Sequence, residues 1–324
     1  MTSDSICVDI GAVNTHADDL RISTRRDIDA LAASIRHLGL MHAPLLRKAD
    51  EGYTVICGFR RIEACRRLQM ASLPARLAEA GISARRCAEL AVADNALQRP
   101  LDELERARCF RLLQPFYTQI DALSRAGRRL GLPAGSAYIR KLLQLCEMPP
   151  PIQQAVARGD ISLSMVDALG KCVPAEAAAL AEIFIALKPS LNKQREILQL
   201  CREIAAREGT SIQALLQTPE LRAVVNAHDE DANRRVAVLR AALRKRRMPA
   251  LSRAQQQFEE QVCALDLGRD LVLIPPAGFE GRTYRFDLRF SSIVDLRRQA
   301  DRLRRLAEHP VMAQILERRQ LNDE

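Results

Sequence analysis

Apolar residues in the first third of the chain recur with two different periods, one typical of helices and one typical of strands. Between positions 24 and 38 they fall at the 3-4-3 spacing of a single helix face, at Ile28, Leu31, Ile35 and Leu38. Thr24 is expected to cap this helix in a capping box with Asp27, and Gly39 is expected to end it. The pattern therefore predicts a first helix over 24–38.

Shorter runs around this helix predict strands. The runs at 44–47, Tyr53–Cys57 and 73–77 are bounded by turn residues and have the length of strands. Helical spacing returns at 60–68 and at 83–96. These segments predict a small α/β unit, after which the chain becomes helical.

One of the predicted strands is joined to a helix through Gly58. A strand that turns through glycine into a helix presents free backbone N–H groups at the positive end of the helix dipole. Arg60 and Arg61 lie at that point, and with the N–H groups they would form a pocket for an anion such as a phosphate. The simpler interpretation is an ordinary strand–helix turn with two solvated arginines.

From position 120 the pattern is that of short helices. Two apolar stripes flank a glycine-containing turn at 131–135: Leu123, Ala126 and Leu130 before it, and Ile139, Leu142 and Leu143 after it. This pattern predicts a helix-turn-helix at about 120–145, whose second helix would enter the major groove of DNA. Any two adjacent helices can produce the same stripes, so plain helical packing stays open as an alternative.

The polar residues of this segment are the candidates for contact with DNA. The second helix would offer side chains to the bases, and the first would hold phosphates. The expected contacts are Ser136, Tyr138, Arg140 and Lys141 on the second helix, and Arg125, Arg128 and Arg129 on the first.

The residues after position 250 are predicted to form a separate unit. Its clearest strand runs over Thr283–Phe290, where every second residue is large and apolar. A second strand is predicted at 270–275 and a helix at 258–265, and Pro249 is expected to mark the linker before them.

A closing helix, capped by Ser292 with Asp295, completes this C-terminal unit. Two strands and two helices are too few to bury one sheet face securely, so self-association through this unit is expected. Packing of the unit against the helical middle is the alternative.

The charge of the chain points to the kind of partner. The 324 residues include 49 Lys and Arg against 40 Asp and Glu, a formal net charge of +9. This balance favours a polyanion as partner, and a content of 4% aromatic residues without tryptophan disfavours a stacking platform for single strands.

The expected compartment follows from what the sequence lacks. It has no run of roughly 18 apolar residues and no basic-then-apolar N-terminus, so we expect a cytoplasmic protein with no membrane partner. The nine cysteines are scattered singly, which is typical of reduced core residues and not of a metal site or disulfide framework.

The order of these motifs resembles the ParB family of DNA-partition proteins. The family's phosphate-binding box, G-E-R-R-x-x-A, is similar to Gly58, Phe59, Arg60, Arg61 and Ala64, with phenylalanine in place of glutamate. The stretches 138–145 and 159–162, around and after the second helix, also match the family, although the turn is a residue or two longer.

A second family motif, E-N-x-x-R, is similar to the segment from Asp94. Aspartate replaces the glutamate, Asn95 is kept, and the arginine lies one residue later than the motif expects. On a helix both Gln98 and Arg99 can share the face of Asn95.

The resemblance implies a fold that is mostly α with a small α/β N-terminal domain. It implies three domains: a ParB/sulfiredoxin-like α/β nucleotide-binding domain at 7–99, a helical domain containing the helix-turn-helix at 100–250, and an α-β-β-α dimerisation domain at 251–324.

The resemblance also implies CTP as the nucleotide, with Mg²⁺ on Asp94. The implied nucleotide-binding residues are Gly58, Arg60, Arg61, Asp94, Asn95, Gln98 and Arg99. CTP would close a homodimer as a clamp around double-stranded DNA, for segregation of a chromosome, plasmid or mobile element at the nucleoid. A partition ATPase is a candidate further partner. In the family the glutamate at the place of Phe59 serves nucleotide turnover, so we expect CTP binding to be retained and hydrolysis to be weak or lost.

Two other functions remain open at this stage. The sequence has no G-x-x-x-x-G-K-[ST] loop, which excludes an ordinary P-loop NTPase. A transcriptional repressor could use the same helix-turn-helix and ignore nucleotide. A nuclease or phosphotransferase on the same fold is the enzymatic alternative.

Overall fold

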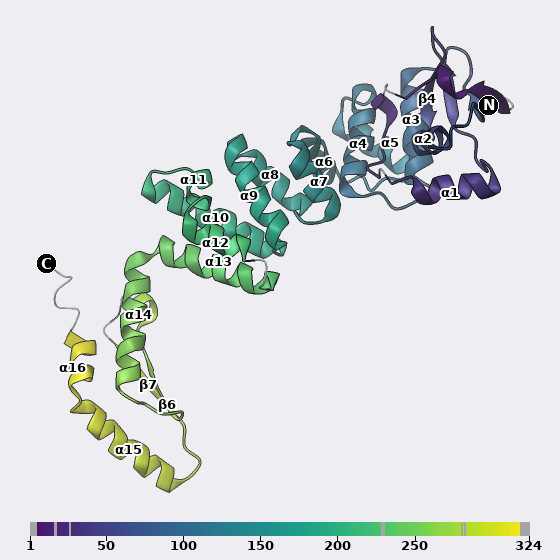
Figure 1. Ribbon diagram of the computed structural model, residues 1–324. Coiled ribbons are helices and arrows are strands. Elements are labelled where there is room, and N and C mark those ends of the chain that lie inside the picture. Colours follow the sequence, from purple (N-terminus) through teal and green to yellow (C-terminus); the bar gives the residue numbers. More distant parts are fainter. Residues whose placement is uncertain are drawn as a thin grey trace. The chain divides into compact units, whose positions relative to one another are not determined.

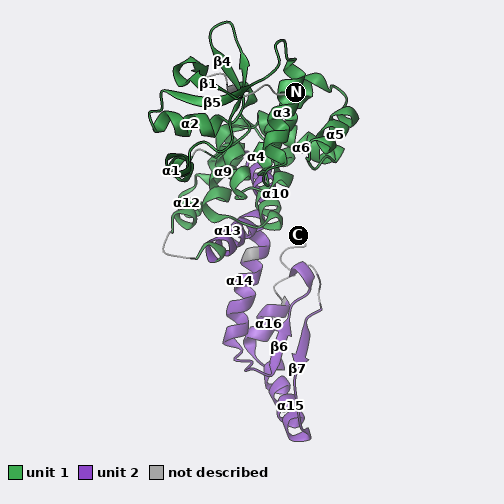
Figure 2. Ribbon diagram, turned by 90° about the vertical axis from the view of Figure 1, so that its right-hand side faces the viewer, with its two compact units in different colours: residues 1–198, 211–233 green, residues 199–210, 234–324 purple. Residues whose placement is uncertain are grey.

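The computed structural model describes residues 5–15, 18–25, 27–227, 231–279, 281 and 283–317, and its elements are mainly helices (Figure 1). Two compact units divide the chain (Figure 2). The first unit comprises residues 1–198 and 211–233, and the second comprises 199–210 and 234–324. The predicted fold class, mostly α with a small α/β N-terminal domain, is confirmed. The division into three domains stays a prediction.

A five-stranded mixed sheet forms the N-terminal part of the first unit. Its strands are β1 (Ser5–Asp9), β2 (Val13–Asn14), β3 (Leu45–Lys48), β4 (Tyr53–Cys57) and β5 (Ser72–Leu77). Their order across the sheet is β1-β5-β3-β4-β2. The pairs β1·β5 and β3·β4 are antiparallel, whereas β3·β5 and β2·β4 are parallel. The strands predicted at 44–47, Tyr53–Cys57 and 73–77 are therefore confirmed.

Helices cover both faces of this sheet. On one face Val55 of β4 packs with residues of α1 (Asp29–Leu38) and α2 (Phe59–Arg67), and on the other Ile56 packs with Cys87 of α3 (Ala84–Ala96). Because neither face is solvated, β4 shows no alternation of burial at its end: Val55, Ile56 and Cys57 are all buried. The sheet thus holds the turn at Gly58 between two packed layers.

The first helix begins later than its pattern predicts. It starts at Asp29, and the capping box of Thr24 with Asp27 does not form. The Thr24 hydroxyl instead donates to a carboxylate oxygen of Asp102 at 2.7 Å, and its backbone N–H donates to Glu105 at 3.1 Å. A tertiary contact has taken the capping residue, which a local pattern cannot reveal.

The rest of the first unit is helical. After α3 the chain forms α4 (Glu103–Leu113), α5 (Ile120–Arg129), α6 (Ser136–Glu147), α7 (Pro150–Arg158), α8 (Val166–Gly170), α9 (Pro174–Leu187), α10 (Leu191–Glu208), α11 (Ile212–Leu216) and α12 (Pro219–Asn226). Helix α10 runs from the first unit into the second. Short 3₁₀ turns lie at Ile10–Ala12, Asp18–Leu20, Gln114–Phe116 and Leu163–Met165.

Helices α5 and α6 form the predicted helix-turn-helix. Leu123, Ile139 and Leu142 from its two stripes are buried. The buried hydroxyl of Ser124 donates to the carbonyl of Ala134 at 2.5 Å, which holds the turn against the first helix. The turn packs on the core through Leu132 and Ala134, which are buried.

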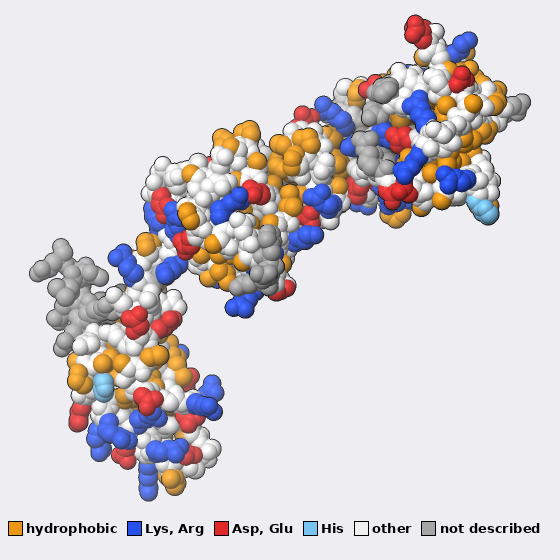
Figure 3. Space-filling model, in the orientation of Figure 1, with side chains coloured by type: hydrophobic (Ala, Val, Ile, Leu, Met, Phe, Trp, Pro, Cys, Tyr) orange, Lys and Arg blue, Asp and Glu red, His pale blue; other side chains and the backbone are white. Residues whose placement is uncertain are grey.

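Among the described residues, the second unit contains the end of α10, three further long helices, one short helix and a small hairpin. Its elements are α13 (Ala232–Arg247), α14 (Pro249–Ala264), β6 (Leu271–Ile274), a 3₁₀ turn (Ala277–Phe279), β7 (Arg285–Leu288), α15 (Ile293–Ala307) and α16 (Pro310–Glu317). The prediction that Pro249 marks a linker is wrong, because Pro249 is the first residue of α14, a position that tolerates proline since no N–H is needed there. Lys and Arg side chains gather over α15 (Figure 3).

The hairpin of the second unit packs one face on its helices. Leu271 and Leu273 of β6 lie in a core with Phe258 of α14, while Val272 between them is 51% exposed. The predicted cap of the closing helix is confirmed, since the Asp295 N–H donates to the Ser292 hydroxyl at 3.1 Å.

Two predictions about composition can be compared with the structure. All nine cysteines are free thiols, and Cys57, Cys65, Cys87, Cys109 and Cys201 are buried. Among the residues that the structure describes, no helix is both long and apolar enough to cross a membrane.

Candidate functional site

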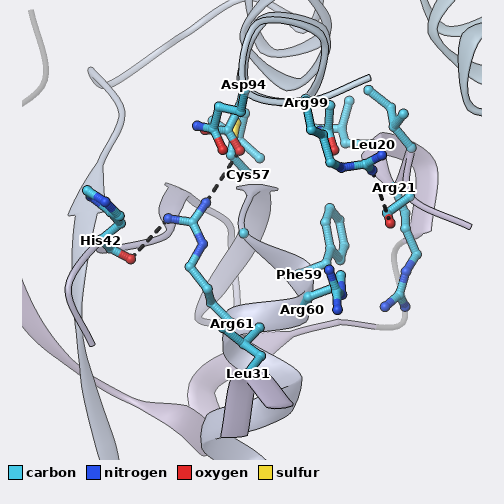
Figure 4. A pocket seen from close by; sticks show the side chains of 16 residues that line it. Leu20, Arg21, Leu31, His42, Cys57, Phe59, Arg60, Arg61, Asp94 and Arg99 are labelled. Carbon is cyan, nitrogen blue, oxygen red and sulfur yellow. Dashed lines mark hydrogen bonds and ion pairs between the residues drawn. The ribbon is translucent and has the colours of Figure 1, made fainter. Parts of the chain in front are cut away.

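A cavity of about 530 Å³ opens in the first unit where β4, α2 and α3 meet (Figure 4). All seven residues predicted to bind nucleotide line it: Gly58, Arg60, Arg61, Asp94, Asn95, Gln98 and Arg99. They come from two segments that are separated by more than thirty positions in the sequence. The wall also includes residues that the sequence did not single out, among them Arg21, Ser23 and His42.

Gly58 makes the turn from β4 into α2 possible. It precedes the helix with φ of 97°, a left-handed conformation that residues with a side chain rarely adopt. A Cβ at this position would lie 2.8 Å from the Cβ of Pro44 and 3.1 Å from the Arg61 guanidinium. The glycine is therefore needed both for the backbone angle and for the space beside the cavity.

Arg61 is tied to both sides of the cavity. Its guanidinium donates to the carbonyl of His42 at 3.0 Å and forms an ion pair with Asp94 at 3.3 Å (Figure 4). Asp94 also accepts a hydrogen bond from Gln98 at 3.0 Å. These contacts join α2 to α3 across the cavity.

Arg60 is held less completely than Arg61. One terminal nitrogen donates to the Asp27 carbonyl at 2.6 Å. Its Nε is buried and has no hydrogen-bond partner among the described residues. An unsatisfied buried donor costs free energy, so an acceptor that came within reach of the Arg60 Nε would be stabilising.

Arg99 is saturated by a buried acid. Its two terminal nitrogens donate to the two carboxylate oxygens of Glu105 at 2.7 and 2.8 Å, and Glu105 is only 1% exposed. Glu105 also accepts from the N–H groups of Thr24 and Asp102. Burial alone would raise the pKa of Glu105, but these hydrogen bonds more than offset it and the pKa lies below its ordinary value. Arg99 thus has a structural partner as well as a place in the cavity wall.

Acidic groups are scarce in the cavity. Asp94 is the one carboxylate among the described residues that line it, and Arg61 and Gln98 already engage it. No group of three or more His, Cys, Asp or Glu side chains that could hold a metal occurs in the described parts of the chain. Mg²⁺ could still be held by one carboxylate together with phosphate oxygens of a ligand, which is its usual mode of binding.

Phe59 lines the cavity and also packs into the core. It is 7% exposed and lies in the cluster with Ile35 and Ile62. The guanidinium of Arg21 lies 5.5 Å from its ring centre and also pairs with Glu63 of the same helix. The side chain in the place of the family's glutamate therefore packs and supports an arginine, and it offers no oxygen to a ligand or to water.

Cys57 lies in the cavity wall, but its thiol is expected to be unreactive. Burial, and secondarily the nearby Asp94 charge, raise the pKa of its thiol to about 12. A thiol with that pKa is almost entirely protonated at neutral pH and is a poor nucleophile. The Cys57 thiol is therefore not a candidate nucleophile.

The helix-turn-helix carries the second group of predicted residues. Arg125, Arg128 and Arg129 of α5 and Arg140 of α6 are exposed, and Lys141 is half-buried. None of these five side chains has an ion pair or hydrogen bond within the described residues. Cations that the protein leaves unpaired on one motif are available to an external polyanion.

Tyr138 and Ser136 differ from these cations. The phenol of Tyr138 donates to Glu103 at 2.5 Å and accepts from Arg106 at 3.1 Å, both on α4. Burial and the Glu103 charge raise the pKa of Tyr138 to about 12. Ser136 donates to Asp121 at 3.4 Å. The hydroxyl of Tyr138 is thus engaged by side chains of α4, unlike the unpaired cations.

Sequence reasoning missed the carboxylates that organise α4. Asp102 and Glu105 form a complete capping box at the start of this helix. The spacing of an acid, two residues and a glutamate before an apolar run was the available signal. Glu105 and Arg99 are only six positions apart, but their contact crosses the break between α3 and α4, so helical spacing does not predict it.

The N-terminal part of the chain is similar to known proteins. Residues 8–96 match the family model described as the ParB N-terminal domain. The Thermus thermophilus protein named chromosome-partitioning protein Spo0J is 31% identical over 140 residues, which are 43% of this chain and 49% of that protein. The nucleoid occlusion protein of Shouchella clausii is 31% identical over 172 residues, 52% of this chain and 58% of the relative.

One solved structure is also similar over part of the chain. It is described as a C-terminally truncated chromosome-partitioning protein ParB from Caulobacter crescentus complexed with CTP-gamma-S. It is 20% identical, covers 56% of this chain and 99% of its own, and has a TM-score of 0.28. The chain spans about half the length of the curated relatives that it matches.

Proposed function

We propose, starting from the ParB N-terminal domain that residues 8–96 form, that this chain is a nucleotide-dependent DNA-binding partition protein. The observation that carries the proposal is the convergence of all seven expected nucleotide-binding residues on one cavity. The family resemblance supplies the role, the segregation of a chromosome, plasmid or mobile element.

The cavity suits the phosphates of a nucleotide. The N–H groups of Phe59 and Arg60 are the first two of α2 and lie at the positive end of its dipole, whereas those of Arg61 and Ile62 donate to the Gly58 carbonyl. Arg60 adds a charged donor whose Nε is unsatisfied. Phosphate oxygens would satisfy both, because they accept several hydrogen bonds and carry the complementary charge.

By the family resemblance the nucleotide is CTP, and Asp94 is the residue that would hold an accompanying Mg²⁺. The chain's own residues would position the triphosphate but contribute little to its hydrolysis. Asp94 is already paired with Arg61, and Phe59 is apolar. We therefore expect binding without efficient hydrolysis.

Isothermal titration of CTP, and separately of ATP, into the full chain with Mg²⁺ tests this proposal. Saturable binding that prefers CTP is the expected result, and a phosphate-release assay on the same sample should give little or no turnover. Absence of binding by either nucleotide would overturn the nucleotide part of the proposal.

The DNA part of the proposal rests on the unpaired cations of α5 and α6. Arg140 is exposed on the second helix of the motif, where side chains reach base edges. Arg140→Ala should weaken binding to the preferred duplex by roughly 1–3 kcal/mol if it reads a base. Arg129→Ala should weaken binding to all duplexes alike and reduce the salt dependence, as expected of a phosphate contact. Equal footprints of all three proteins would move DNA binding to another surface.

We further propose that the second unit forms a homodimer. Its two-stranded sheet has short strands, and Phe290, Ile293 and Val294 near the start of α15 are 55%, 62% and 69% exposed. A second copy that covers these residues would remove apolar surface from water. Deleting 251–324 should give monomers by light scattering, and a persisting dimer would contradict this assignment. A clamp closed by nucleotide around DNA, and a partition ATPase as partner, complete the proposal by the family resemblance.

A repressor that does not use nucleotide is the second candidate. It is favoured by the pairing of Arg61 with Asp94 and of Arg99 with Glu105, since both arginines already have protein partners. It predicts binding at a single site, no spreading along DNA, and no effect of CTP. The enzymatic alternative, a nuclease or phosphotransferase, requires magnesium-dependent turnover that is lost when Asp94 or Arg60 is changed.

A further inference from the structure

A cleft of about 570 Å³ lies beside the second helix of the helix-turn-helix. Its wall contains Lys141 of α6 and residues of the segment 159–164, which joins α7 to the 3₁₀ turn Leu163–Met165 and its first residues. The stretch 159–162 resembles the family in sequence, but it has no part in the proposed function. The cleft therefore brings a predicted DNA contact next to a segment without an assigned role.

Two donors in the wall of this cleft are open. Lys141 is half-buried, and its ammonium group has no ion pair or hydrogen bond to any described residue. The half-buried hydroxyl of Ser164 likewise has no hydrogen bond within the described part of the chain. Glu103, the one acid among the described residues of the wall, already accepts from Tyr138 and pairs with Arg106. An open cation and an open hydroxyl in one cleft suit an external anion such as a phosphate.

A buried glutamine holds the segment 159–164 in place. Gln194 of α10 is 2% exposed. Its amide nitrogen donates to the carbonyls of Asp160 at 3.0 Å and Pro189 at 2.8 Å, and its amide oxygen accepts from the Ser162 N–H at 3.3 Å. One side chain thus satisfies three backbone groups and ties the segment to the start of α10.

Further contacts carry this restraint to Ser164. The Ser162 hydroxyl accepts from the Ser164 N–H at 3.3 Å. Near the start of the segment the Asp160 carboxylate, which is 6% exposed, is bonded by Arg158 at 2.9 Å and by Lys188 at 3.2 Å. The segment is therefore held from its first residues up to Ser164.

We propose that Lys141 and Ser164 bind one phosphate of the DNA backbone beside α6, and that Gln194 is the positioning residue for this contact. The proposal rests on the proposed DNA-binding function of the helix-turn-helix. It reassigns Lys141 from reading bases to holding a phosphate, and it leaves Arg140 as the cation of α6 that reads a base edge. Phosphate contacts fix the register of a protein on the duplex without reading its sequence.

The short reach of a serine is the physical reason why this contact needs a positioning residue. The backbone decides where a serine hydroxyl lies, whereas a lysine has a flexible four-carbon stem and can adapt. Without the Gln194 amide, three backbone groups lose their partner and the segment must shift to satisfy them elsewhere. Ser164 would then lose the phosphate, while Lys141 would keep it.

The test measures DNA binding by the full chain in fluorescence anisotropy over a series of salt concentrations. One duplex is selected with the wild-type protein from a random library, and the other has a scrambled sequence. Lys141→Ala should weaken binding to both about 10-fold, and the slope of log affinity against log salt should become shallower by about 0.9. Ser164→Ala should weaken both roughly 3- to 10-fold and leave the slope unchanged, because serine carries no charge.

Gln194→Met tests the positioning role. Methionine has a similar length but no amide, so the variant should weaken binding by roughly the same 3- to 10-fold as Ser164→Ala. In the Gln194→Met background, Ser164→Ala should have no further effect and Lys141→Ala should keep its full effect. Gln199→Met is the matched control and should bind DNA like wild type, since the exposed Gln199 lies on the same helix and bonds Glu203 at 2.9 Å.

Other outcomes separate this proposal from the DNA-binding function. If Ser164→Ala binds both duplexes like wild type, the segment does not touch DNA and the proposal fails, while the function stands. If Lys141→Ala changes the preferred sequence, Lys141 reads a base and the shared phosphate site is refuted. If Gln194→Met and Gln199→Met weaken binding equally, the effect is a general loosening of α10 and the positioning role fails. If wild type binds neither duplex, the DNA-binding function fails first and this proposal fails with it.

A measurement on wild type covers the case in which Gln194→Met does not fold. Hydrogen exchange of the amides at 162–164 should slow when the selected duplex is added, because a bound phosphate restrains local opening of this segment. Unchanged exchange there, with the duplex bound, would overturn the phosphate contact.

Discussion

Arg60 and Arg99 line the same cavity, yet their surroundings differ in kind. Arg60 follows the glycine turn and has a buried nitrogen without a partner among the described residues. Arg99 follows α3 and has both ends of its guanidinium on a carboxylate that is 1% exposed. Arg60 thus has an unsatisfied donor beside the cavity, whereas both terminal nitrogens of Arg99 are already bonded to Glu105.

The two arginines are both predicted to bind nucleotide, but this difference gives them separate roles in ligand binding and in stability. A ligand gains most from a donor that the protein leaves unsatisfied, whereas a saturated donor must first break its own bonds. Arg60 is therefore expected to govern affinity, and the Arg99–Glu105 pair is expected to govern stability. Four changes test this contrast, in order of decreasing effect.

Glu105→Ala should have the largest effect. It leaves Arg99 and the N–H groups of Thr24 and Asp102 without their acceptor. Removing one partner of a buried pair costs roughly 3 kcal/mol or more of unfolding free energy. Urea denaturation followed by circular dichroism measures it.

The control for this change is Glu147→Ala. Its ion pair with Arg111 is exposed on both sides, so the loss should be within about 0.5 kcal/mol. Equal destabilisation by the two changes would contradict the structural role of Glu105.

Arg60→Ala should act on binding and little on stability. Losing a charged donor to phosphate costs roughly 1.5–3 kcal/mol, which is about 10- to 150-fold in the dissociation constant of CTP. Arg67→Ala is the matched control, because Arg67 lies on the same helix in an exposed ion pair with Asp29. Titration calorimetry compares them, and an equal loss in both would mean that only the net charge of α2 matters.

Gly58→Ala sharpens the contrast by changing the backbone beside Arg60. Gly58 and Gly159 both have left-handed backbone angles, with φ of 97° and 80°, but of the two only Gly58 would bring a Cβ close to other atoms. Gly159→Ala should cost about 1 kcal/mol for the angle alone, and Gly58→Ala about 1 kcal/mol more for the crowding. Thermal or urea unfolding measures the difference, and equal costs would show that the turn relaxes freely.

The pH dependence should show the smallest effect. The pKa of Glu105 is lowered on folding, so its contribution to stability is complete above its ordinary pKa of 4.5 and is lost as the pH falls through the lower folded value. Glu105→Gln should therefore lose less stability than wild type between about pH 5 and pH 3, by at most ~1.4 kcal/mol per pH unit. Parallel pH profiles of the two proteins would contradict the lowered pKa.

The sequence allowed much of the fold to be predicted where local pattern and tertiary structure agree. The strand Tyr53–Cys57, its turn at Gly58 and the helix after it could be predicted because period and glycine coincide. The start of α1 could not, because Thr24 bonds α4 in place of its own helix. Pro249 was read as a break, although the first turn of a helix accepts proline.

The candidate site shows the same limit. Motif spacing was enough to select residues that the structure gathers around one cavity. It did not show which of them the protein itself satisfies, because Arg61 pairs with Asp94 across 33 positions and Arg99 pairs with Glu105 across the break between α3 and α4. The hydrogen bond from Tyr138 to Glu103 spans 35 positions, so the sequence pattern could not predict it.

The N-terminal sheet also sets an order of events during synthesis. Strand β1 leaves the ribosome first, but it pairs only with β5, and Cys7 contacts Ser72 across 65 positions. The helix that starts at Gly58 is local and can form while the chain is still growing, whereas the sheet closes only after Leu77 has emerged. Arg66 at the end of that helix then bonds Thr15 and the carbonyl of Val13. A nascent chain halted before β5 should therefore remain open to protease, and one halted just after it should gain protection.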